Sequence, residues 1–150
     1  MQEPPLDQPL GPDAFFRAQL AAGRIMLQRS SRTGRCFFYP RVCEPGTGER
    51  GLDWVEASGL GRVYSATTVR QKPEQGGDYN LSLIDLDEGP RLMSRVVGSP
   101  PETVAIGARV QAFVGRMDDA ADGELLVLFR LADPVAPQNS APQQPAPVTP

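Results

Sequence analysis

The sequence predicts a mainly β protein, with one N-terminal helix followed by short strands, the last five of which form a small closed or half-closed barrel. A helical pattern is confined to residues 12–23, whereas short β-rich runs alternate with turn-forming stretches such as QKPEQGGD and DEGP from Arg24 onward. The length of 150 residues, 40% of them hydrophobic, allows a single compact domain with one buried core.

The helix is expected over residues 12–22, between two flexible ends. Pro12 suits the first helical turn, Asp13 lies near the positive end of the helix dipole, and Gly23 supplies the stop. Four prolines lie in the first twelve residues and six follow Asp133. This composition predicts a flexible arm over residues 1–11 and a disordered proline-rich tail over residues 131–150.

The strands are expected where β-branched and aromatic side chains alternate with polar ones. Three short strands precede the barrel and five longer ones form it. Their predicted ranges are 24–29, 35–39, 53–57, 62–70, 79–86, 91–97, 108–114 and 124–130.

The composition excludes several classes of function. The chain has no histidine, so a Ser-His or Cys-His catalytic pair cannot form within it. It has no apolar run of membrane-spanning length and no secretory signal at its N-terminus, so we expect a cytoplasmic protein that does not enter a membrane. In that compartment Cys36 and Cys43 are expected as reduced thiols rather than as a disulfide.

Four runs carry a family resemblance: FFRAQLAAGRIMLQR (15–29), WVEASGLGRVYS (54–65), LIDLDEGPRLMSRVVG (83–98) and IGARVQAFV (106–114). Their order and spacing resemble the zinc-ribbon and OB-fold family first catalogued as domain of unknown function number thirty-five. The resemblance covers residues 13–130 and implies a rubredoxin-like ribbon over 24–57 and a five-stranded OB-fold barrel over 58–130. It also implies an accessory subunit encoded with thiolases and related acyl-CoA enzymes, whose catalytic residues belong to the partner.

The resemblance implies that the helix and ribbon dock on a thiolase-like subunit, while the barrel helps to shape the acyl-CoA site. The partner-binding candidates are Phe15, Phe16, Leu20, Phe37 and Phe38. For the two adjacent phenylalanines of the helix, burial in the core is an alternative interpretation.

Three arginines on predicted barrel strands are candidate contacts for the phosphates of coenzyme A, because arginine suits phosphate and OB-folds bind ligands on their strands and loops. They are Arg62, Arg91 and Arg95. The alternative is that they are outward-facing strand residues with cross-strand acidic partners such as Asp85.

The ribbon departs from the family pattern at its metal ligands. The four cysteine positions of the family correspond here to Ser30, Thr33, Cys43 and Gly46, so one thiol remains. Hydroxyls are poor zinc ligands, and we therefore predict a degenerate ribbon without zinc and no cofactor in this chain. Without an ion, the ribbon is expected to rely on aromatic packing, turn hydrogen bonds or the partner, and to become ordered on the partner.

These observations together predict a non-catalytic accessory subunit in a hetero-oligomer with a thiolase-like enzyme, with acyl-CoA at the shared site. The alternative is an OB-fold protein that binds single-stranded nucleic acid, which needs a basic groove with interleaved aromatic side chains. Acidic side chains outnumber basic ones between residues 59 and 130, and the net charge of the chain is −3, so nucleic acid is the less favoured partner. An independent enzyme has the least support.

Overall fold

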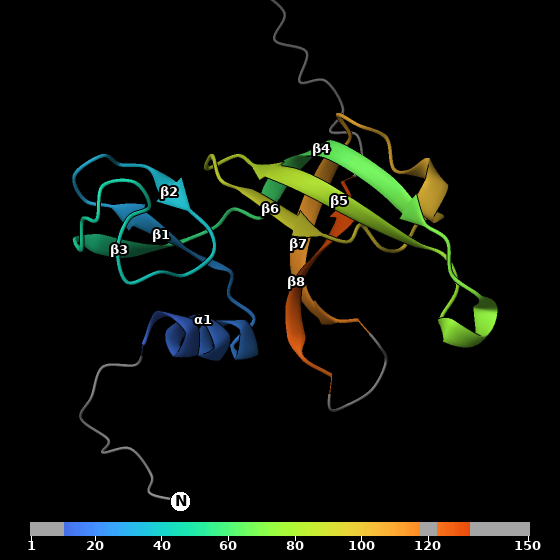
Figure 1. Cartoon of the computed structure of the whole chain (residues 1–150), viewed down its shortest axis with the longest axis horizontal. Helices are drawn as coiled ribbons and strands as arrows, with labels where there is room; N and C mark the ends of the chain where they lie inside the picture. Colours follow the sequence, from blue (N-terminus) through green and yellow to red (C-terminus); the bar gives the residue numbers. More distant parts are fainter. Residues whose placement is uncertain (1–10, 118–122, 133–150) are drawn as a thin grey trace, which may run out of the picture.

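The computed structural model describes residues 11–117 and 123–132, which form one α-helix, eight strands and two short 3₁₀-helices (Figure 1). The expected flexible arm and tail fall mainly on residues 1–10 and 133–150, which lie outside the described residues. The elements are α1 (Pro12–Ala21), β1 (Met26–Ser30), β2 (Cys36–Phe37), β3 (Leu52–Glu56), β4 (Leu60–Val69), η1 (Pro73–Gln75), β5 (Tyr79–Leu86), β6 (Arg91–Ser94), η2 (Pro101–Thr103), β7 (Arg109–Arg116) and β8 (Leu125–Leu131).

Helix α1 begins and ends close to where the sequence predicts. It starts at Pro12 and ends at a turn in which the N–H of Gly23, at φ 77°, donates to the carbonyl of Leu20 (2.8 Å). A ten-residue helix is not stable alone in water, so α1 depends on the burial of Phe16 and Leu20, one turn apart on its inner face. In the described part of the chain, no helix is long and apolar enough to cross a membrane.

Strands β2, β1 and β3 form an antiparallel sheet in that order, and residues 24–57, which contain it, are called the ribbon subdomain below. The predicted strand 35–39 is too long, because β2 ends at Phe37. Phe38 and Tyr39 leave the sheet, and the Phe38 ring packs edge-on against Phe16 of α1 (5.5 Å between ring centroids). The aromatic run therefore joins the ribbon to the helix instead of extending the strand.

Strands β4 to β8 form a curled antiparallel sheet in the order β6-β5-β4-β7-β8 (Figure 1). A short parallel bridge joins Val96 to Phe129, where the Phe129 N–H donates to the Arg95 carbonyl (3.0 Å) and the Phe129 carbonyl accepts the Val97 N–H (2.8 Å). The bridge partly closes the sheet on itself. The predicted class, a mainly β protein with an N-terminal helix and a five-stranded OB-fold barrel, is confirmed.

A single hydrophobic core connects the helix and both sheets. Phe16 and Leu20 of α1 belong to the same buried cluster as Leu27 of the ribbon and Val63 and Phe129 of the barrel. Burial of apolar side chains is the main favourable term in folding, so the three parts stabilise one another.

The junction between the two sheets is short and tightly packed. The Ser58 N–H donates to the Glu88 carboxylate (2.6 Å), and Gly59 takes a positive φ of 77°. Strand β4 then passes so close to β5 that a Cβ atom on Gly61 would lie 2.8 Å from the Asp85 carbonyl oxygen. Glycine is required there by close approach of the two backbones.

Candidate functional site

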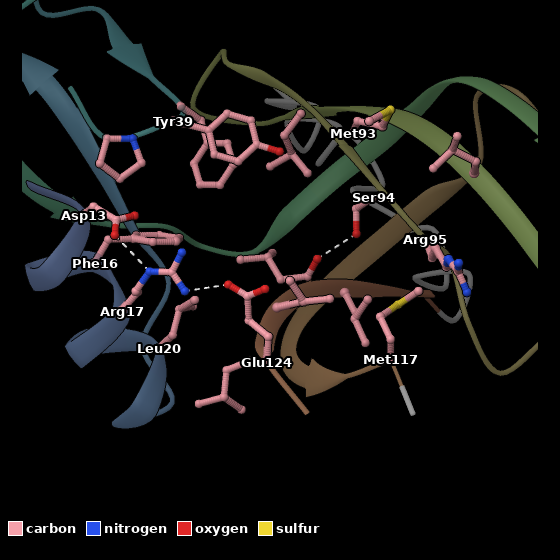
Figure 2. Close-up of a pocket in the computed structure, with 18 residues that line it drawn as sticks. Asp13, Phe16, Arg17, Leu20, Tyr39, Met93, Ser94, Arg95, Met117 and Glu124 are labelled. Atoms are coloured by element: carbon pink, nitrogen blue, oxygen red, sulfur yellow. Dashed lines mark hydrogen bonds and ion pairs between the residues drawn. The ribbon is translucent and has the colours of Figure 1, made fainter. Parts of the chain in front are cut away.

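An apolar groove of about 340 Å³ lies between α1, the loop after β2 and the edges of β6 and β8 (Figure 2). Phe16 and Leu20 contribute from the helix, and Tyr39 from the loop. Met93 of β6 and Leu126 of β8 line the opposite side. All three parts of the fold therefore contribute to one concave surface.

The groove exists because the barrel is not closed along its whole length. Strands β6 and β8 are the two edge strands of the five-stranded sheet, and within the described residues no ladder of hydrogen bonds joins residues 91–94 to β8. The Ser94 hydroxyl donates to the Val127 carbonyl (2.6 Å) and bridges the gap at one point. Edge strands present unpaired backbone groups, so the groove combines an apolar lining with two polar strand edges.

Charged side chains border the groove. Arg17 donates to Asp13 within α1 (2.9 Å) and to Glu124 just before β8 (2.5 Å), and Figure 2 shows it between the two carboxylates. These three side chains are each more than half exposed, so the pairs orient the rim rather than stabilise it strongly. Arg95 lines the groove as well, and its guanidinium lies over the Tyr79 ring, 3.6 Å from the centroid.

The predicted partner-binding residues differ in their burial and in whether they line the groove. Phe16 and Leu20 are buried, with 8% and 4% of their surface exposed, and line the floor of the groove. Phe37 and Phe38 are both half-buried, and of the two only Phe38 lines the groove. Phe15 is half-buried outside the groove, where its ring packs on the Trp54 ring (4.7 Å between centroids).

Two exposed side chains at the groove, Tyr39 and Met93, were not predicted from the sequence. Tyr39 is 55% exposed and Met93 is 56% exposed, although both line it. Tyr39 directly follows the phenylalanines that were singled out, so the FFYP run offered a signal. Met93 lies in a short strand whose alternation places Leu92 in the core and its neighbour outside.

The three candidate phosphate contacts do not form a single cluster of free cations. Arg91 and Asp85 are cross-strand partners joined by two hydrogen bonds (2.6 and 3.0 Å), which lower the pKa of the Asp85 carboxyl. Arg62 pairs in register with Asp85 from the other side and donates to the Gly107 carbonyl (2.8 Å). Arg95 lies apart from them, at the groove.

In the ribbon subdomain a hydrogen-bond network centres on Glu44 and includes Ser30 and Thr33, two of the four positions that the resemblance matches to metal ligands. Thr33 and Thr47 each donate a hydroxyl to the Glu44 carboxylate, one to each oxygen, at 2.8 Å. These two hydroxyls, followed by Ser30, lower the pKa of Glu44. The fully buried Ser30 also accepts the N–H of Thr33 (3.2 Å).

These residues do not fit a zinc ion. Of the four ligand positions, Gly46 has no side chain and Cys43 is the only thiol. Across residues 11–117 and 123–132, no group of three or more His, Cys, Asp or Glu side chains could hold a metal ion. Cys36, the other thiol, is also free, and burial raises its pKa.

The comparisons with known proteins include a family model that matches most of the barrel. The family model described as "ChsH2, C-terminal OB-fold domain" matches residues 54–114. A solved structure titled "Ltp2-ChsH2(DUF35) aldolase" matches with a TM-score of 0.67 and 28% identity, over 86% of this chain and 98% of that chain. A DUF35 protein of unknown function from Sulfolobus solfataricus matches with a TM-score of 0.55 at 18% identity, which shows the fold alone.

Curated relatives extend the match in sequence. A "DUF35 domain-containing scaffold protein" from Methanocaldococcus jannaschii is 31% identical over 100 residues, which cover 63% of this chain and 71% of the relative. The protein of that name from Pyrococcus furiosus is 31% identical over 99 residues, covering 64% and 72%. A "Probable enoyl-CoA hydratase alpha subunit" from Thermomonospora curvata is 32% identical over 100 residues, which cover 65% of this chain and 31% of that longer subunit.

Proposed function

The chain belongs to the DUF35 family, and from this membership we propose that it is a non-catalytic accessory subunit that docks on a thiolase-type or related acyl-CoA enzyme and helps to form its acyl-CoA site. The names of the similar proteins support an accessory role, because they include scaffold proteins, a probable enoyl-CoA hydratase subunit and an aldolase that contains a DUF35 chain. The chain also lacks histidine, the commonest general base.

The observation that carries the docking proposal is the groove with its exposed apolar rim. Large apolar side chains that line a concave surface and stay exposed are typical of interaction sites. Tyrosine and methionine, the two residue types at this rim, are enriched in protein interfaces. We propose that an apolar segment of the catalytic subunit covers Tyr39 and Met93 and also contacts Phe38, which lines the groove, whereas Phe37 does not line it.

Among the three arginines, Arg95 is the strongest candidate for a phosphate of coenzyme A. Arg91 already has a carboxylate partner, and a phosphate would have to compete with Asp85 for it. Neither Arg62 nor Arg95 has a carboxylate partner within the described residues, and Arg95 lies at the groove where the partner is proposed to bind. Its guanidinium can stay stacked on Tyr79 while its N–H groups point to a phosphate.

Co-expression with a neighbouring thiolase-like gene product, followed by gel filtration, tests the proposal. We expect a mixed oligomer that catalyses acyl-CoA turnover, and no turnover by this chain alone. Tyr39→Asp and Met93→Asp should each abolish the mixed peak. Val42→Asp is the matched control, because Val42 is 66% exposed and does not line the groove. A mixed oligomer that survives both rim substitutions, or that Val42→Asp disrupts equally, would refute docking at the groove.

Nucleic acid is the alternative, and the barrel's aromatic side chains argue against it. Arg91 lies over the Tyr64 ring at 3.3 Å and Arg95 over the Tyr79 ring at 3.6 Å, so an arginine already occupies one of the two faces on which a base would stack in each ring. Retardation of oligonucleotides by the free chain at physiological salt would overturn this assignment.

A further inference from the structure

We propose that the Glu44 carboxylate takes the structural place of a metal ion in the ribbon subdomain (residues 24–57), which therefore folds without one. The proposal concerns how the subdomain is held together and does not depend on which enzyme the chain binds.

The network joins two turns of the ribbon subdomain, one at residues 30–34 and the other at residues 44–48. In the first turn, the Gly34 N–H donates to the Ser30 carbonyl (2.8 Å), and in the second the Gly48 N–H donates to the Glu44 carbonyl (3.0 Å). Each turn then contributes one threonine hydroxyl to the same carboxylate: Thr33 from the first and Thr47 from the second. Glu44 therefore cross-links the two turns, as a metal ion bound by both would do.

The charge pattern is the reverse of a metal site. In a zinc ribbon a cation lies at the centre and the turns supply electron-pair donors. Here a carboxylate lies at the centre and the turns supply hydrogen-bond donors. Glu44 is 2% exposed, and a buried carboxylate is tolerated only when its oxygens are hydrogen-bonded. Hydrogen bonds to a charged acceptor are stronger than neutral ones, which makes this arrangement a suitable cross-link.

A second buried side chain fixes the segment between the turns. The Gln28 amide donates to the Arg41 carbonyl (2.8 Å) and accepts the Arg41 N–H (2.6 Å). The loop that carries Phe38 and Tyr39 is thus tied to the sheet on one side and leads to the Glu44 turn on the other. We therefore expect the ribbon to be ordered in the free chain, in contrast to the expectation from the sequence that it becomes ordered on the partner.

The test uses the purified full-length chain. We expect substoichiometric zinc by elemental analysis and an unchanged Tm after treatment with EDTA. Glu44→Ala should lower the Tm by roughly 5 °C, because it removes the buried carboxylate that accepts the hydroxyls of Thr33 and Thr47. It should also accelerate amide exchange across residues 30–50. Asp53→Ala, which removes an exposed carboxylate from the same subdomain, is the control and should change neither property.

A milder pair of variants keeps the proposal testable if Glu44→Ala does not fold. Thr33→Val and Thr47→Val each remove one donor and keep the side-chain shape, and each should accelerate exchange in its own turn by about tenfold. One zinc ion per chain, a Tm that falls in EDTA, or exchange in the Glu44 and threonine variants equal to that of Asp53→Ala would overturn the proposal. None of these measurements involves the partner. Failure of this proposal can therefore be told apart from failure of the docking proposal.

Discussion

Replacement of Leu20 by alanine tests how α1 is attached to the rest of the fold. Leu20 is buried in the common core on the inner face of α1. Removal of a buried leucine side chain costs about 2–5 kcal/mol, which for a chain of this size lowers the Tm by roughly 10 °C. If the loss of stability is about 5 kcal/mol, α1 should undock before the barrel unfolds, because a short helix is not stable alone.

The single tryptophan makes this undocking measurable. Trp54 lies in β3 with its ring packed on Phe15 of α1, so its fluorescence reports docking of the helix, while far-UV circular dichroism reports the sheets. In urea, we expect Leu20→Ala to show an early fluorescence change followed by the main transition. Leu131→Ala is the control, because Leu131 is 36% exposed at the end of β8. If Leu20→Ala loses no more stability than this control, the helix is not held by its buried face.

Three other substitutions test separate parts of the structure. Asp85→Asn should cost less than about 1 kcal/mol, because the pair with Arg91 is partly exposed. Since Arg91 lowers the folded-state pKa of Asp85, the stability it contributes is fully present above the unfolded pKa of about 3.9 and is lost as the pH falls through the lower folded value. The difference in Tm between wild type and Asp85→Asn should therefore shrink below pH 4, and a difference that persists there would contradict the assignment. Phe15→Asp should change the tryptophan fluorescence, because it breaks the packing of the Phe15 ring on Trp54, and should leave co-purification with the enzyme partner in place, because Phe15 does not line the groove; loss of co-purification would place Phe15 in the docking surface. Cys36→Ser should remove a slow, pH-dependent phase of thiol labelling, because burial raises the pKa of Cys36, and a fast phase lost instead would refute that burial.

Local features were predictable from the sequence. Proline and glycine mark both ends of α1, and the turn DEGP places Asp85 and Arg91 on adjacent antiparallel strands, where they pair as cross-strand neighbours. The β5 boundaries were also correct, because polar stretches bound that strand on both sides. In each case the information lies within about ten residues of chain.

The groove and the Glu44 network were not predictable in the same way. The groove requires α1 to meet β8, and the Arg17–Glu124 pair that borders it joins residues 107 positions apart. For the ribbon, the count of metal-ligand positions gave no indication of the hydrogen-bond network around Glu44. Thr33 was read as a lost ligand, whereas its hydroxyl is a donor to a glutamate that no ligand pattern includes.

The glycine-lined joint between the two sheets has a consequence for assembly. Because Glu88 holds the Ser58 N–H at the entry to β4, and the ribbon and barrel share one buried core, the structure places the two sheets against each other without a partner. A catalytic subunit that spans both must match this arrangement, and little backbone freedom is lost here when the two meet. Selection among acyl-CoA enzymes would then operate through rigid geometry as well as through the chemistry of the contacting side chains.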